Sequence, residues 1–187
     1  MDLIDCLDAA FAATGRLIAK ASPDDFGAPT PCSDWDVRML LNHTIGVVAR
    51  FGIVASRSGE AVDLTTDWVG TDPSSRFEAL AGPTLAAWST PGALDGPLIL
   101  PNGRASTALD GGRRNFVDTL VHGWDLATAV GLDATIEPAL ATAALEASEL
   151  IMSDGLRGPG RPFAAPVQVG PGASPTDRLV AFLGRRP

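Results

Sequence analysis

Two histidines and one aspartate of this chain have the residue types and the spacing of a metal site. His43 and His122 are the 2 histidines of the sequence, and each lies in a stretch with helical periodicity. Asp118 precedes His122 by four residues, and side chains at i and i+4 are neighbours on a helix face. Asp118 and His122 could therefore bind one ion while His43 approaches from a facing helix. Two imidazoles and one carboxylate leave coordination positions open, as in catalytic metal sites.

These residues and their neighbours also have ordinary explanations. A single histidine in an apolar helical stripe is more often a core or surface residue than a ligand. Asp125 could accept the second N–H of an imidazole or form a pair at the surface. Arg114 could pair with Asp118, attract an anionic substrate or face solvent. Trp35 and Trp124 are read as core or pocket-wall aromatics, with stacking on a ligand as the alternative. No catalytic acid–base residue can be assigned from the sequence.

Apolar residues at three- and four-residue spacing predict four principal helices. These helices are expected at residues 2–21, 34–56, 112–130 and 137–153. A further segment, 72–90, is expected to be an extra or kinked helix because Gly82-Pro83 interrupts it. Ser33 and Asp36 have capping-box spacing, which predicts that the second helix begins at about residue 34.

The remaining segments predict small additions to a bundle. Residues 91–109 favour a hairpin around Pro101-Asn102-Gly103. Residues 155–187 are expected to form a tail packed on the bundle, ending in a short helix capped by Ser174. The sequence therefore predicts one all-α domain over residues 1–187, a four-helix bundle with a hairpin-like insertion and a short C-terminal helix.

Composition limits the partners and the location. A net charge of −8 argues against nucleic acid and anionic membranes as partners. The segment MDLIDCLDAAF lacks the cationic start of a signal peptide, and no run of about 18 uninterrupted apolar residues is present. We therefore expect a cytoplasmic protein, in which Cys6 and Cys32 pack as free thiols rather than form a disulfide. Cys32 precedes a helix start and is a minor reactive candidate.

Two motifs and the end of the chain resemble a known family. TPCSDWDVRMLLNHTIG is similar to the first motif of the DinB-like superfamily, in the branch containing the N-terminal domains of mycothiol-dependent maleylpyruvate isomerases. DTLVHGWDLATAVG resembles the second motif of that branch, including its D-x-x-x-H and H-x-W-D-L-A parts. The ending ASPTDRLVAFLGRRP is similar to the tail of small actinobacterial members. Together the motifs are specific for the family and much less specific for one reaction.

The resemblance implies a bundle that holds a divalent metal, zinc or nickel, with His43, Asp118 and His122 as ligands. Iron(II) is a further option because it favours two histidines and one carboxylate. The characterised isomerase has Glu where this chain has Asp118, so the ion would lie closer to this helix or be held more loosely. The isomerase also uses a C-terminal domain, for which 187 residues leave no room. That difference speaks against isomerase activity itself.

The resulting expectation is a metal-binding enzyme, related to thiol-dependent S-transferases and isomerases, that acts on a small molecule. Family members bind a low-molecular-weight thiol such as mycothiol at the open metal positions. The ion should face an apolar pocket with few polar groups, between the second and fourth helices and reached past residues 91–110. The alternatives are a non-catalytic bundle that binds a small molecule and a degenerate member without metal. The oligomeric state, including a homodimer, stays open.

Overall fold

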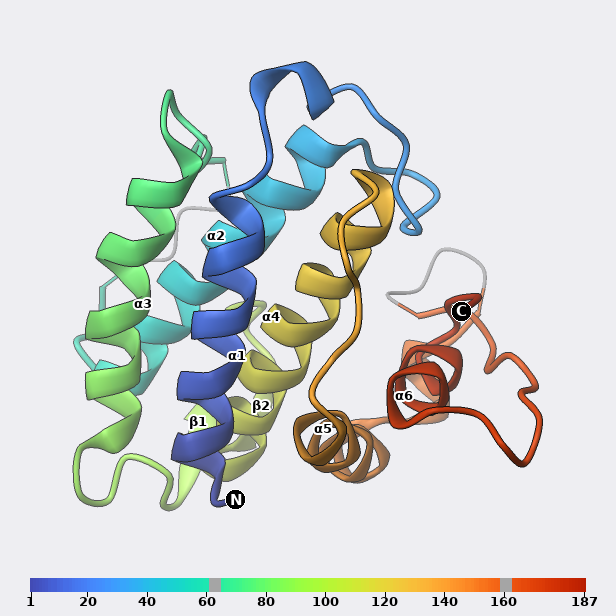
Figure 1. Cartoon of the computed structure of the whole chain (residues 1–187). Coiled ribbons are helices and arrows are strands. Elements are labelled where there is room, and N and C mark those ends of the chain that lie inside the picture. Colours follow the sequence, from blue (N-terminus) through green and yellow to red (C-terminus); the bar gives the residue numbers. More distant parts are fainter. Residues whose placement is uncertain (61–64, 159–162) are drawn as a thin grey trace.

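The computed structural model describes residues 1–60, 65–158 and 163–187 as an all-α fold with one small hairpin (Figure 1). The helices and strands are α1 (Leu3–Ile18), η1 (Pro23–Asp25), α2 (Val37–Ser56), α3 (Pro73–Ser89), β1 (Pro97–Ile99), β2 (Ala105–Thr107), α4 (Ala108–Ala129), α5 (Pro138–Ile151), η2 (Asp154–Leu156) and α6 (Pro175–Phe182). Helices α1 to α4 run side by side, whereas α5 crosses below them and packs against α6 (Figure 1). The prediction of an all-α bundle with a hairpin and a C-terminal helix is confirmed.

The third helical segment is present as a helix, and it belongs to the bundle rather than being an addition to it. Helix α3 packs against α1 and α2 as a full member of the bundle, and it continues unbroken through Pro83. Proline removes a hydrogen bond to the carbonyl four residues earlier. Both Pro83 and that residue, Ala79, are exposed, so water can satisfy the carbonyl. Phe77 and Trp88 on the opposite face are buried and hold the helix in place.

The second helix begins later than predicted. Asp36, not Ser33, is its N-cap, and the Asp36 carboxylate accepts a hydrogen bond from the Met39 N–H at 2.8 Å. The residues before Asp36 therefore form a loop, and Cys32 and Trp35 of this loop line the candidate site. The fourth helix begins earlier than predicted, at Ala108, directly after the hairpin.

A hydrogen-bonded close approach fixes α4 against α1. The Thr14 hydroxyl donates to the Thr119 carbonyl at 3.0 Å, and both residues are buried. A Cβ at Gly123 would lie 2.6 Å from the Thr14 Oγ1, so glycine is needed for this contact. The residues of α4 that carry the site are thus held rigidly.

Helix α2 is both long and apolar. Among the described residues it alone is long and apolar enough to cross a membrane, and 56% of its most apolar window is buried inside the protein. Leu40, Leu41 and Ile45 are almost completely buried in the core. Its packing against both α3 and α4 accounts for its composition.

Candidate functional site

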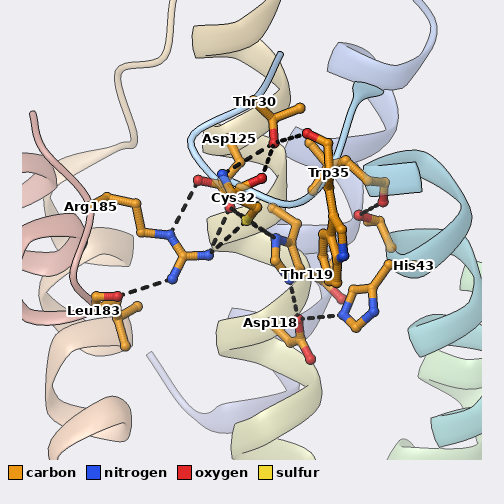
Figure 2. A network of polar contacts seen from close by, with 12 residues as sticks. Thr30, Cys32, Trp35, His43, Asp118, Thr119, Asp125, Leu183 and Arg185 are labelled. Carbon is orange, nitrogen blue, oxygen red and sulfur yellow. Dashed lines mark hydrogen bonds and ion pairs between the residues drawn. The ribbon is translucent and has the colours of Figure 1, made fainter. Parts of the chain in front are cut away.

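The three predicted ligands lie together between α2 and α4. Asp118 Oδ1 lies 2.8 Å from His122 Nε2 and 3.4 Å from His43 Nε2. One ligand atom from each of the three side chains lies within 4.8 Å of the others. Figure 2 shows His43 reaching from one side toward Asp118 on the neighbouring helix. The spacing of four residues on α4 and the facing histidine on α2 therefore produce the expected cluster.

The geometry of this cluster fits a small divalent cation. Nitrogen and oxygen ligands about 2.0–2.2 Å from a tetrahedral zinc ion lie roughly 3.3 Å from one another. The contact of Asp118 with His43, at 3.4 Å, lies close to that value, whereas its contact with His122, at 2.8 Å, is shorter, as in a direct hydrogen bond. The Asp118 and His43 side chains are 31% and 30% exposed, so one side of the cluster is open. Metal binding by these residues stays a prediction.

Asp125 and Arg185 hold the inner side of His122. The Asp125 Oδ2 lies 2.9 Å from His122 Nδ1 and accepts its hydrogen, so Nε2, which faces Asp118, is the ring nitrogen that would bind a cation. Arg185 donates to both carboxylate oxygens of Asp125, through Nε at 3.2 Å and Nη2 at 2.8 Å. The Asp125 side chain is completely buried and Arg185 is 8% exposed. Of the two alternatives for Asp125, acceptance of the second N–H of an imidazole is therefore the one that the structure shows. Nothing in the sequence pattern pointed to Arg185.

The charges of the network shift the pKa of its members strongly. Burial alone would raise the pKa of Asp125, but the hydrogen bond from His122 and the charge of Arg185 lower it to about 2. Burial would also raise the pKa of Asp118, but the charge and hydrogen bond of His122 lower it further below its ordinary range. Burial would lower the pKa of His122, yet Asp118 and Asp125 raise it well above 6.5. The same carboxylates would stabilise a bound cation.

Cys32 completes the network and is more closely involved than its sequence suggested. Its thiol donates to Asp125 Oδ2 at 3.3 Å, and Arg185 Nη2 lies 3.6 Å from the sulfur (Figure 2). Cys32, His122 and Asp125 form a second group with metal-ligand spacing. The guanidinium of Arg185 already supplies the positive charge there, so a metal ion would be repelled. The cluster of His43, Asp118 and His122 is therefore the better cation site.

The loop before α2 places Cys32 and Trp35 against the histidines. The Thr30 hydroxyl lies 3.1 Å from the Cys32 carbonyl and 2.9 Å from the Trp35 carbonyl, so its one hydrogen can be donated to either, and its oxygen accepts from the Cys32 N–H at 3.1 Å, which closes a tight turn. The Trp35 ring lies 4.6 Å from the His43 ring and 5.7 Å from the His122 ring, centre to centre. Trp35 thus forms a wall of the site, whereas Trp124 is buried in the core.

A cavity of about 1100 Å³ opens from the cluster. The hairpin turn at Pro101 lines it, as expected for the segment 91–110, but so do Phe163 and Arg185 of the C-terminal segment. The expectation of few polar groups is wrong because four arginines line the cavity. They are Arg50, Arg104, Arg114 and Arg185. Arg114 donates to the Ile151 carbonyl at 3.0 Å and, in the described structure, forms no ion pair with Asp118.

The chain is similar to known proteins over most of its length. The family model described as "Mycothiol maleylpyruvate isomerase N-terminal domain" matches residues 7–127. Two uncharacterised proteins of Mycobacterium tuberculosis, from strains CDC 1551 / Oshkosh and H37Rv, are each 34% identical over 176 residues, covering 94% of this chain and 92% of their own. No solved structure matches the chain.

Proposed function

The chain belongs to the family of the mycothiol maleylpyruvate isomerase N-terminal domain, and we propose that it is a metal-dependent enzyme that joins a small thiol to a small electrophile. The convergence of His43, Asp118 and His122 beside an open cavity carries this proposal. A buried structural metal would have its coordination closed by a fourth protein ligand. Here two of the three side chains are about one-third exposed on the cavity side.

His43, Asp118 and His122 would hold zinc or nickel, or iron(II), which favours the same ligands. Such an ion supplies Lewis acidity that keeps a thiol or water deprotonated near neutral pH. Asp125 fixes the His122 ring so that Nε2 faces the cavity. Trp35 packs on both imidazoles and shields them from water. In the transfer, a bond forms between the thiol sulfur and an electrophilic carbon, and the leaving group departs with the electron pair of its bond.

The family name supports a thiol of low molecular weight, with mycothiol as the first candidate. A cavity of about 1100 Å³ has room for a thiol and a second small molecule. We further propose a cytoplasmic protein without nucleic-acid or membrane partners, in line with its net charge of −8. A homodimer is compatible with this function, which needs one chain for each site.

Metal analysis and thiol consumption together test the function. Purified protein is expected to contain about one divalent ion per chain, and to consume mycothiol with chlorodinitrobenzene as the electrophile. His43→Ala and His122→Ala should each abolish stoichiometric metal, and Asp118→Asn should weaken binding because it removes the charge but keeps the shape. Cys32→Ser is the control, since it should retain the metal.

The outcomes separate the proposal from its two alternatives. Metal without thiol consumption would indicate a non-catalytic bundle that binds a small molecule. Absence of metal after loading with zinc, nickel and iron(II) would indicate a degenerate family member. Full metal occupancy in a variant that lacks both histidines would refute the site itself.

A further inference from the structure

One end of the cavity carries positive charge that the proposed function does not use. Arg50, Arg104 and Arg114 all line the cavity of the candidate site. In the part of the chain that the structure describes, none of the three forms an ion pair with a carboxylate. Three such arginines in one cavity are unexpected in a chain with a net charge of −8.

The three arginines lie on the same side of the metal centre. Helices α2 and α4 run in opposite directions (Figure 1). Arg50 follows His43 by seven residues on α2, and Arg114 precedes Asp118 by four residues on α4. At about 1.5 Å per residue, both are displaced toward the same end of the bundle by roughly 6–10 Å. Arg104 belongs to the turn between β1 and β2, just before α4 begins.

Arg114 has one buried donor that the described residues do not satisfy. Its Nη2 donates to the Ile151 carbonyl at 3.0 Å, which fixes the guanidinium at the end of α5. Its Nε is buried and has no hydrogen-bond partner among the described residues. Burial lowers the pKa of Arg114, the charge of Asp110 raises it, and the nearby charge of Arg104 lowers it again. A buried unpaired donor is costly, and an acceptor in the cavity would remove that cost.

Arg50 is partly buried and also lacks a partner. Its side chain makes no hydrogen bond within the described residues, and burial lowers its pKa, partly offset by the charge of Asp118. A Cβ at Gly46 would lie 2.9 Å from Arg50 Nη1, so the glycine makes room for the guanidinium against α2. Asp118 and Asp34 are the carboxylates that line this cavity, and Asp118 is committed to the two histidines.

We propose that Arg50 and Arg114 bind the oxyanion of a small acidic substrate, a carboxylate or a phosphate, whose reactive end reaches the metal centre. This inference rests on the proposed function and names the class of its electrophile. Guanidinium groups match the geometry of both oxyanions with paired N–H donors. The offset of roughly 6–10 Å along the helix axes between the arginine and ligand positions matches the length of a small organic acid. Arg104, exposed on the hairpin, adds attraction at the entrance.

Binding of simple anions tests the proposal without any catalytic assay. Succinate and inorganic phosphate are titrated, in buffer of low ionic strength, into chelator-treated and zinc-loaded protein, with calorimetry and arginine Nε–H NMR as readouts. Arg50→Gln and Arg114→Gln remove the proposed contacts. Arg113→Gln is the matched control because Arg113 lies on the same helix, pairs with Asp110 at 2.9 Å and does not line the cavity.

The expected result is one anion per chain, with a shift of the Arg114 Nε–H resonance on binding. Each cavity variant should bind at least about tenfold more weakly, which corresponds to about 1.4 kcal/mol. The control should stay within about twofold. The anion that binds more tightly identifies the group as carboxylate or phosphate. Arg50→Gln secures the test if Arg114→Gln fails to fold, since Arg50 bonds to no described residue.

Three results would overturn the inference. These are no binding of either anion to the unmodified protein, equal weakening in the control, and binding that disappears on chelation but survives in both cavity variants. The last result would place the anion on the metal alone. Because the expected binding persists in chelator-treated protein, a failure of metal binding and a failure of anion binding are distinguished.

Discussion

Replacement of Arg185 should destabilise the protein and weaken its metal site together. Arg185 is the third residue from the end of the chain, yet it donates to both oxygens of the buried Asp125. In Arg185→Met the carboxylate would keep the hydrogen of His122 Nδ1 and the Cys32 thiol as partners. A buried charge would then lose its guanidinium counterion, and His122 would be its remaining cationic partner.

The size of the effect follows from the burial of the pair. Asp125 is completely buried and Arg185 is 8% exposed, so solvent screens neither charge. Removal of one partner from a buried pair costs about 3–5 kcal/mol. Arg185→Lys keeps the charge but loses the two parallel hydrogen bonds, so it should fall between Met and the unmodified protein. Asp125→Asn combined with Arg185→Met should show a coupling energy of about 1–3 kcal/mol.

Urea unfolding and metal titration measure the two consequences. Metal affinity should fall by about 10–100-fold in Arg185→Met, because Asp125 no longer orients His122. Arg186→Met is the matched control, since Arg186 is the next residue and is exposed. It should change stability by less than about 0.5 kcal/mol. A loss below about 1 kcal/mol in Arg185→Met, or a coupling energy near zero, would refute the structural argument.

Two further predictions concern the pH response and the core. The pKa of His122 is raised well above 6.5 in the folded protein. Protonated His122 therefore stabilises the metal-free protein fully below pH 6.5, and this stabilisation is lost as pH rises through the higher pKa of the folded state. The melting temperature of chelator-treated protein should therefore fall above neutral pH, and that of zinc-loaded protein should not; equal profiles would contradict the assignment. Asn115→Leu removes the acceptor for the buried Trp88 Nε1, 3.0 Å away, and should cost about 1–3 kcal/mol in urea unfolding. An unchanged unfolding midpoint would show that the indole N–H finds another partner.

The predictable parts of the site are those that depend on neighbours along one helix. Asp118 and His122 follow from a spacing of four residues, and His43 from the apolar face it shares with Leu40 and Val47. The family motifs reinforced the same three residues. The sequence did not reveal that α3 is a full member of the bundle, because a proline within a helical stretch usually predicts a kink or break. Pro83 is tolerated because it lies on the exposed face of α3. Whether a proline breaks the helix or is tolerated depends on whether its face is buried, and the residues next to Pro83 in the sequence do not settle that.

The parts that escaped prediction depend on distant segments. Cys32 and Arg185 are separated by 153 residues and meet at Asp125. No spacing rule predicts such a contact, because the course of the tail over the bundle sets it. The cationic end of the cavity is similar, since its arginines come from α2, the hairpin and α4. A buried aspartate in a motif signals that a counterion is needed, without indicating which of the 14 lysine and arginine residues provides it.

The two carboxylates beside His122 have different environments, and the difference assigns their roles. Asp118 is 31% exposed, contacts both histidines and has no guanidinium partner among the described residues, so its charge is available to a cation in the cavity. Asp125 is completely buried, and Arg185 neutralises it, so it orients the imidazole without attracting a second ion. Because Arg185 belongs to the C-terminal segment, docking of that segment and the geometry of the metal centre are coupled. A tail that leaves the bundle would release Asp125, free the His122 ring and lower the affinity for metal in a single event.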